Sequence, residues 1–188
     1  MKFSELSRRS FTLGALAGVS LTAACGNGIG NTNAEALDIR VSQTLEQMYQ
    51  AYPNTRDLAS KANGMLVMPV VTEAGFGFGG AYGQGALRIA DATVDYYSVA
   101  EVSGGLQIGA QQYSHVLFFM TDDALSDFRK SSGWAAGADI KYVISDVGDG
   151  ANASTTTALS PVLAAVFNRG GLYAGAALEG NKYTRIIP

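Results

Sequence analysis

The sequence predicts a single α+β domain: a strongly curved antiparallel sheet, or a barrel, with two N-terminal helices and one inserted helix. Residues 64–87 change from a continuous apolar run to glycine at every second or third position, and strand-like runs separated by Gly, Asp and Asn follow. The connections between these runs are too short for the crossovers of a parallel sheet. Helical periodicity occurs only before residue 64 and again at residues 121–132.

The first 24 residues resemble an export signal rather than part of the fold. Arg8 and Arg9, within the run Ser-Arg-Arg-Ser-Phe, resemble a twin-arginine signal. The uncharged stretch at residues 11–24 is shorter than the roughly 20 residues that span a bilayer. We therefore expect residues 1–24 to be a cleaved signal peptide.

Cys25 is the only cysteine, and the residues Leu-Thr-Ala-Ala before it resemble a bacterial lipobox. This pattern predicts that Cys25 becomes the first mature residue and carries a lipid; the alternative is a plain secretory signal that leaves a free thiol. Residues 25–33, rich in Gly and Asn, form the expected flexible tether. Because Gly26 is not the aspartate typical of inner-membrane retention, we expect attachment to the outer membrane of the bacterial cell envelope, facing the periplasm or the surface.

The expected domain covers residues 34–188 and is acidic. Without residues 1–24 the chain keeps ten basic and fifteen acidic side chains, a net charge of −5. This charge argues against nucleic acid as a partner and against general adhesion to anionic lipid. An anionic ligand therefore needs a local basic pocket.

Two helices are expected at the start of the domain. Residues 37–52 alternate apolar and polar positions at helical spacing and stop before Pro53. This helix faces the core or lies on a membrane, and the single basic residue of its polar face, Arg40, favours the core. A second, short helix begins at Asn54 or Thr55 and is expected to stop at Gly64.

The glycine-rich stretch is the centre of the expected sheet. Residues 65–71 read as a buried central strand, and residues 65–120 as at least five strands in a meander. Glycines such as Gly75, Gly77 and Gly79 leave one face bare, so that another strand, a helix or a ligand can approach the backbone. The GxGxxG pattern here lacks the helix that a dinucleotide site requires, so no cofactor is expected.

The later chain supplies one helix and the closing strands. Thr121 caps a helix that ends with Arg129 and Lys130 before Gly133, and these charges suit the helix dipole. Strands are expected at residues 139–145, 162–167, 172–178 and 183–187, with a polar loop at 146–157. Trp134 is expected to pack in the core rather than to anchor an interface.

The candidate catalytic and metal residues favour structural roles. His115 is the only histidine, with neither a second histidine nor a free thiol to complete a zinc site or a triad. The acidic loop at residues 146–152 does not match the EF-hand spacing, so a solvated loop is favoured over weak calcium binding. No enzymatic activity and no metal are therefore expected.

Four segments together resemble one family. They are AGFGFGGAYGQGAL, VDYYSVAEVSGGLQIGAQ, FFMTDDALSDFRKSSGWAAGAD and GGLYAGAALEGNKYTRI, within residues 59–187. The chain is similar to the SYLF lipid-binding family, in its bacterial lipoprotein branch. The resemblance implies a lipid-binding fold without naming the head group, since the eukaryotic members' basic N-terminal helix is not present here.

The leading hypothesis is a non-enzymatic envelope lipoprotein that binds membrane phospholipid. The candidate lipid-binding residues are Lys61, Arg129 and Lys130, at the rim of a cleft beside Gly75, Gly77 and Gly79. One alternative is a structural or protein-interaction component of the envelope with a protein partner. Another is an enzyme that uses His115 with nearby carboxylates.

Overall fold

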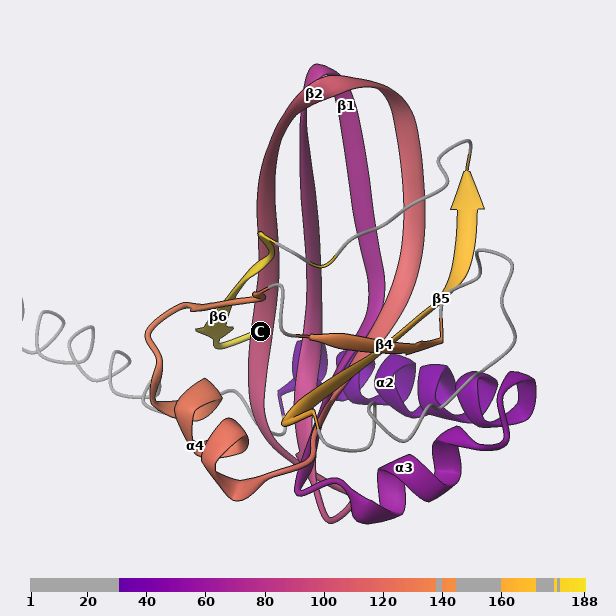
Figure 1. Ribbon diagram of the computed structural model, residues 1–188, viewed down its shortest axis with the longest axis vertical. Coiled ribbons are helices and arrows are strands. Elements are labelled where there is room, and N and C mark those ends of the chain that lie inside the picture. The colour runs from indigo at the N-terminus through magenta and orange to yellow at the C-terminus, as the bar shows by residue number, and fades with distance from the viewer. Residues whose placement is uncertain (1–30, 138–139, 145–159, 172–177, 179) are drawn as a thin grey trace, which may run out of the picture.

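The computed structural model describes residues 31–137, 140–144, 160–171, 178 and 180–188. Arg8, Arg9 and Cys25, the polar loop at 146–157 and all but the last residue of the expected strand at 172–178 lie outside the described residues. The described part forms one α+β domain in which three helices pack on a strongly curved sheet (Figure 1). The predicted fold class is confirmed.

Two very long strands dominate the sheet. β1 (Gly64–Ile89) and β2 (Ala92–Phe119) pair antiparallel from the turn at Ile89 and Ala92 to the far ends at Gly64 and Phe119. The turn between them holds two residues with positive φ, Ala90 at 46° and Asp91 at 65°, as in tight hairpin turns. Figure 1 shows both strands bending back at the upper end of the molecule, so that each has two arms.

The prediction of at least five separate strands between residues 65 and 120 is wrong. The pairing of β1 with β2 shifts register near residues 68–71, 76–78 and 87–88 but continues past each shift. Glycines and bulges bend a strand without ending its ladder. Turn-forming residues therefore mark bends here, and the meander is one folded-over hairpin.

The bare face of β1 is covered by the other arm of the same strand. A Cβ atom at Gly83 would lie 2.6 Å from the Val70 carbonyl oxygen and 2.9 Å from Val71 Cγ2. A Cβ atom at Gly85 would collide with the Val67 carbonyl oxygen. Of the three possible neighbours for the glycines, the structure shows a strand at these two positions.

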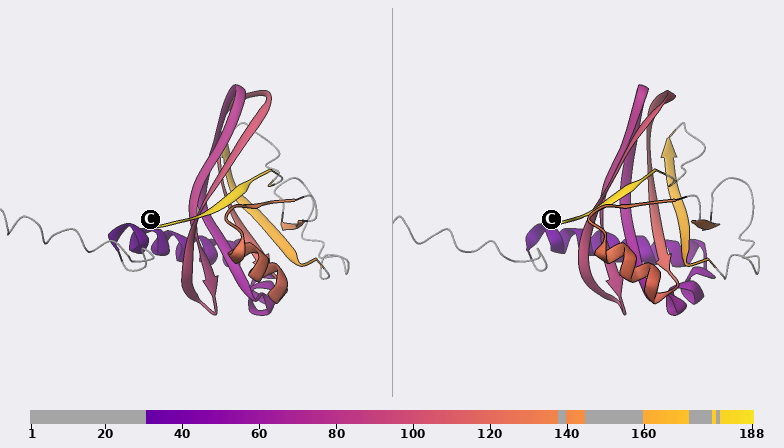
Figure 2. Two further views of the ribbon diagram at one scale, coloured as in Figure 1. Left: turned by 90° about the vertical axis from the view of Figure 1, so that its left-hand side faces the viewer. Right: turned by 60° about the vertical axis from the view of Figure 1, so that its left-hand side comes forward.

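The remaining strands extend the sheet into a half-barrel, which Figure 2 shows from two sides. β6 (Lys182–Ile186) pairs with the first arm of β2, and β3 (Trp134–Ala135) pairs with β6. β5 (Val162–Gly171) pairs with the second arm of β2, and β4 (Lys141–Ile144) pairs with β5.

One strand pair departs from the expected antiparallel arrangement. β4 and β5 run parallel, from Lys141 opposite Leu163 to Ile144 opposite Ala165. A parallel pair needs a connection of about a dozen residues or more. Residues 145–161 supply that length, whereas the short connections on which the antiparallel prediction rests belong to residues 65–120.

The first arm of β1 is buried on both faces. On the inner face, Leu66 and Met68 join the interior core with Phe119 and Phe128. On the outer face, Met65 and Val67 pack beneath the first helix, α2 (Thr32–Ala51). The side chains that α2 buries against the sheet are Leu37, Val41, Leu45 and Met48. Both the central strand and the core-facing helix are confirmed.

Two of the three described helices have a side-chain cap at their start, whereas Asn54, before the short second helix, makes no capping hydrogen bond through its side chain. Asn31 accepts a hydrogen bond from the Ala34 amide at the start of α2, and Thr121 does the same for Ala124 at the start of α4 (Asp122–Lys130). α3 (Thr55–Lys61) ends at Lys61, and Gly64 begins β1 instead of stopping the helix.

Candidate functional site

A groove beside α4 gathers basic side chains from two elements; we call it the α4 groove. It has a volume of about 380 Å³. The lining residues are Asp122, Leu125, Ser126, Arg129, Lys130 and Arg185. Arg129 and Lys130 lie in the last turn of α4, where cations suit the helix dipole, and Arg185 comes from β6.

A nearly buried aspartate orients the two arginines of the α4 groove. Asp95, whose side chain is 11% exposed, lies 3.3 Å from Arg129 Nη2 and 3.4 Å from Arg185 Nη2. Arg185 also donates to the Arg129 carbonyl oxygen at 3.1 Å and lies over the Tyr97 ring. One carboxylate thus holds two cations in place and offsets only part of their charge.

Arg185 keeps its charge in this groove. The hydrogen bond to the Tyr97 hydroxyl raises the pKa of Arg185, so that its guanidinium stays protonated. Burial is the main cause that raises the pKa of Tyr97, which keeps this neighbour neutral. Lys130 has no ion pair with the residues that the structure describes.

The structure brings together only part of the predicted lipid-binding set. Arg129 and Lys130 share the α4 groove, but Lys61 does not line it and binds Asp57 Oδ2 at 2.6 Å. Gly75, Gly77 and Gly79 lie midway along β1, between the two arms that meet at Gly83 and Val70. Figure 1 shows this bend at the opposite end of the molecule from α4. The predicted single cleft that joins the cations to these glycines is therefore not formed.

A second groove lies between α3 and the β1–β2 turn; we call it the α3 groove. It has a volume of about 530 Å³ and is lined by Arg56, Arg88, Tyr49 and Asp91, among others. Arg56 donates to both Glu46 carboxylate oxygens at 3.3 Å, and its guanidinium carbon lies 4.5 Å from the centre of the Tyr49 ring.

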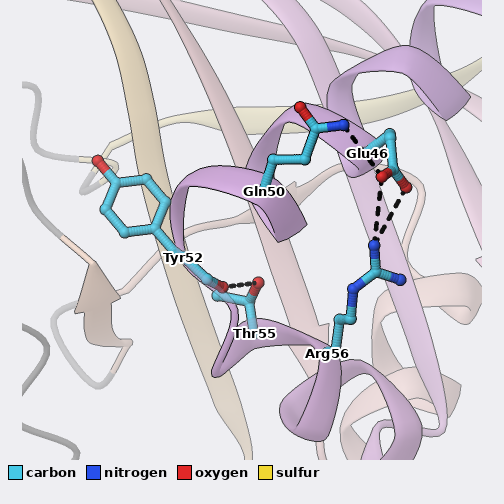
Figure 3. Close-up of polar contacts among 5 residues, drawn as sticks. All are labelled: Glu46, Gln50, Tyr52, Thr55 and Arg56. Carbon is cyan, nitrogen blue, oxygen red and sulfur yellow. Dashed lines mark hydrogen bonds and ion pairs between the residues drawn. The ribbon is translucent and has the colours of Figure 1, made fainter.

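Figure 3 shows how the corner between α2 and α3 fixes Arg56. Gln50 donates to Glu46 Oε1 at 3.2 Å, and the Thr55 hydroxyl donates to the Tyr52 carbonyl oxygen at 2.7 Å. Arg56 is therefore held by an acid. Arg88 is held in turn by the Ser42 hydroxyl, at 3.1 Å, and by the Asp91 carbonyl oxygen. The α3 groove has fewer uncompensated cations than the α4 groove.

His115 lies inside the half-barrel. It is fully buried, and its Nε2 is 2.9 Å from the Tyr183 hydroxyl. Burial lowers the pKa of His115 to about 3, so the imidazole is neutral at physiological pH. Trp134 packs against the same core, with its ring 5.7 Å from that of Tyr183. The core position predicted for Trp134 is confirmed.

The described residues contain neither a membrane-spanning helix nor a cluster of metal-ligating side chains. Among them, no helix has the length and apolar character to cross a bilayer. The same residues contain no group of three or more His, Cys, Asp or Glu side chains placed to hold a metal ion.

Comparison with protein families identifies the domain. Residues 100–185 match the family described as Ysc84, Las17-binding protein actin regulator. This region belongs to the Ysc84, or SYLF, family. A comparison with curated proteins gave no match.

The match covers the part of the SYLF domain that carries the α4 groove. All six lining residues of that groove fall within residues 100–185. The first motif of the resemblance, which contains Gly75 and Gly79, and the α3 groove lie before the matched region.

Sequence reasoning missed Arg185 and Asp95 as members of one site. Arg185 is 56 residues from Arg129, and Asp95 is 34 residues from it. The alternation of β6 was visible in the sequence, but the pairing of β6 with the first arm of β2 was not.

Proposed function

We propose that this SYLF domain binds the phosphate group of a membrane phospholipid in the α4 groove, without catalysing a reaction. The observation that carries the proposal is the convergence of Arg129, Lys130 and Arg185 beside the apolar side chain of Leu125. Arginine pairs with phosphate through two parallel hydrogen bonds, and lysine adds a point charge. An apolar neighbour suits the glycerol and acyl part of a lipid.

The preorganisation of the arginines supports this role. Asp95 and Tyr97 restrict Arg129 and Arg185 before any ligand arrives, which reduces the entropy lost on binding. Lys130 is exposed and has no ion pair with the described residues, so that it can approach an anionic surface directly.

The position of the chain at residue 31 also supports it. Asn31 Nδ2 donates to the Pro188 carbonyl oxygen at 3.0 Å, so the start of the described chain adjoins the end of β6. At about 3.5 Å per extended residue, Cys25 can lie no farther than roughly 20 Å from Asn31. A lipid on Cys25 would therefore hold the β6 side of the domain, which bears Arg185, near the membrane.

We accordingly propose an envelope lipoprotein exported by a twin-arginine signal and anchored through Cys25. Replacing Cys25 with Ser should release the protein from membranes, because the lipid attaches to the sulfur. Replacing Arg8 and Arg9 with Lys should block export. Unchanged membrane attachment in the first variant, or unchanged export in the second, would contradict the respective part of the proposal.

Binding to vesicles tests the lipid proposal. The protein without residues 1–25 is mixed with vesicles of neutral lipid or of neutral plus anionic lipid, and co-sedimentation is measured. Each cation near an anionic surface contributes about 1 kcal/mol, or roughly a fivefold change in affinity. We expect that loss from Lys130→Ala and a smaller one from Lys61→Ala, whose lysine is already paired with Asp57.

Two results would reject the α4 groove. The first is the absence of binding to vesicles of any head group. The second is an equal loss in Lys61→Ala and Lys130→Ala, which would indicate diffuse attraction instead of a site.

One observation favours a protein partner as a second candidate. Val102 is 92% exposed and Tyr82 is 56% exposed, on the paired strands β1 and β2. Exposed apolar side chains that lie together suit contact with another envelope protein. Capture of a defined partner that is lost in Val102→Ser, with no vesicle binding, would favour this interaction role.

A further inference from the structure

The inner face of the half-barrel changes from apolar to polar along its length. Alternate residues of a strand share a face, so β2 presents Leu117, His115, Tyr113 and Gln111 inward in that order towards the bend. Val71 on β1 and Val99 on the first arm of β2 also belong to the interior core. Two residues further towards the bend, the same faces carry Glu73 and Glu101.

Two fully buried side chains in this region have polar atoms without a hydrogen bond. His115 Nδ1 and both polar atoms of Asn181 have no hydrogen bond, although each residue is 0% exposed. Burial raises the pKa of Tyr113 and Tyr183, and the nearby Asn181 amide offsets part of this rise. A buried polar group without a partner costs about 1–3 kcal/mol, so hydrogen bonds from a ligand to these three atoms would stabilise the domain.

The charge around these atoms is negative. Burial, and secondly the carboxylate of Glu73, raise the pKa of Glu101. After burial, the charges of both glutamates also raise the pKa of Tyr113. Gln111 donates a hydrogen bond to Glu73 Oε2 at 2.6 Å. His115 is neutral and adds no positive charge. Among the described residues, no basic group is a cause of the shifts at Glu101 or Tyr113.

These features select the ligand by its chemistry. Two carboxylates attract a cation, and a buried amide with a neutral imidazole offers both donors and acceptors. The described carboxylates and the histidine do not form a group suited to a metal ion. The tyrosines beside them suit an organic cation.

We propose that the inner face around Glu73, Glu101, Asn181 and His115 binds a small organic ammonium compound that also carries a hydroxyl group. The ammonium group lies against the two glutamates, and the hydroxyl reaches the unpaired atoms of Asn181 and His115. This site lies towards the bend, away from the α4 groove, and does not depend on the proposed lipid role. The ammonium group can belong to a free amine or to an ethanolamine head group.

Ethanolamine is the probe for the first test, with the purified full chain. Ethylene glycol serves as the control of similar size that lacks the charge. Trp134 reports binding by fluorescence, because its ring contacts Tyr183, which in turn holds His115. We expect a saturable fluorescence change and a thermal midpoint that rises with ethanolamine concentration, and neither effect with ethylene glycol.

Matched variants locate the binding. Glu101→Gln should weaken ethanolamine binding at least tenfold, and Asn181→Leu should also weaken it. Glu35→Gln should have no effect, because Glu35 lies on the exposed side of α2. If Asn181→Leu does not fold, the partly exposed Glu101 still provides the test. Vesicles with phosphatidylethanolamine, compared with phosphatidylcholine alone, show whether the ammonium group can come from a lipid.

Two results would support the site and show where the ammonium group comes from. Saturable binding of free ethanolamine would indicate a free amine. Glu101-dependent binding to phosphatidylethanolamine vesicles alone would indicate a lipid head group. The inference is overturned if neither binds. It is also overturned if ethylene glycol acts equally, or if Glu101→Gln binds as the parent does, because the inner face then holds water only.

Discussion

Adding a single methyl group to the bare face of β1 should show that this face is packed against protein. In Gly83→Ala the new Cβ would lie 2.6 Å from the Val70 carbonyl oxygen and 3.1 Å from Val71 Cα. Both neighbours are backbone atoms, so they cannot turn away as a side chain would. Val71 is paired with Tyr113, and Val70 lies in the register shift just before it. Gly85→Ala would place its Cβ against the Val67 carbonyl oxygen in the same way.

The expected cost follows from the neighbours. Overpacking a well-packed core costs about 1–3 kcal/mol, and contacts with rigid backbone lie at the upper end. For a domain of this size, 1 kcal/mol lowers the thermal midpoint by about 2–4 °C. We expect Gly83→Ala and Gly85→Ala each to lower it by roughly 6–12 °C.

Gly80→Ala provides the matched control on the same strand. Its Cβ would meet only the Glu101 carbonyl oxygen, at 3.1 Å, so a shift of a few tenths of an ångström accommodates it. Thermal and urea unfolding of the three variants, with vesicle binding as a second readout, distinguish the alternatives. If Gly83→Ala and Gly85→Ala unfold like Gly80→Ala but bind less lipid, the glycines line a ligand cleft and our account of them is wrong.

Substitutions at three further positions test the charges and the cap. Asp95→Asn should lower the free energy of unfolding by about 1 kcal/mol, because its arginine partners are half-exposed. It should strengthen binding to anionic vesicles, because the asparagine oxygen can still accept hydrogen bonds from the arginines while one negative charge is removed; weaker binding would show that the charge of Asp95 is needed to hold them. The pKa of His115 falls from 6.5 to about 3 on folding, so stability should decrease as the pH falls from 6.5 towards 3, by up to about 1.4 kcal/mol per pH unit. His115→Gln should lack this component, and equal slopes in urea titrations would contradict it. Thr121→Ala should cost about 1 kcal/mol and Thr121→Ser little, since Thr121 caps α4; equal losses would exclude the cap.

Local patterns in the sequence were enough to predict the helices. The spacing of apolar residues in α2 and the Thr121 cap of α4 both depend on neighbours within one or two turns. The ends of the strands were harder to predict, because glycine can either end a strand or bend it. Gly83 and Gly85 remain inside a paired strand only because the ladder with β2 continues beside them.

Only part of the candidate site could be predicted from the sequence, because its residues come from distant parts of the chain. Arg129 and Lys130 are adjacent in the sequence, but the helix dipole alone accounts for two cations in the last turn of a helix. Their presence was therefore weak evidence for a binding site. What makes them a candidate site is Arg185, which reaches the same groove through the pairing of β6 with β2. The inner-face site around Glu73, Glu101, Asn181 and His115 is harder still to predict from the sequence, since Glu73 and Asn181 are far apart along the chain.

The separation of the two charged regions constrains how the domain can meet a membrane. The chain as a whole is acidic, with a net charge of −3, so an anionic surface repels it on average. The α4 groove offers three cations at the end opposite the bend, and the partly exposed Glu73 and Glu101 lie towards the bend (Figure 1). An approach with the α4 end first is therefore favoured electrostatically, and it points the bend of the sheet away from the bilayer. Raising the salt concentration should weaken binding through the α4 groove, because screening acts on its exposed cations. An amine bound among the buried atoms of Asn181 and His115 should be less sensitive to salt, so the two proposed sites can be told apart by that dependence.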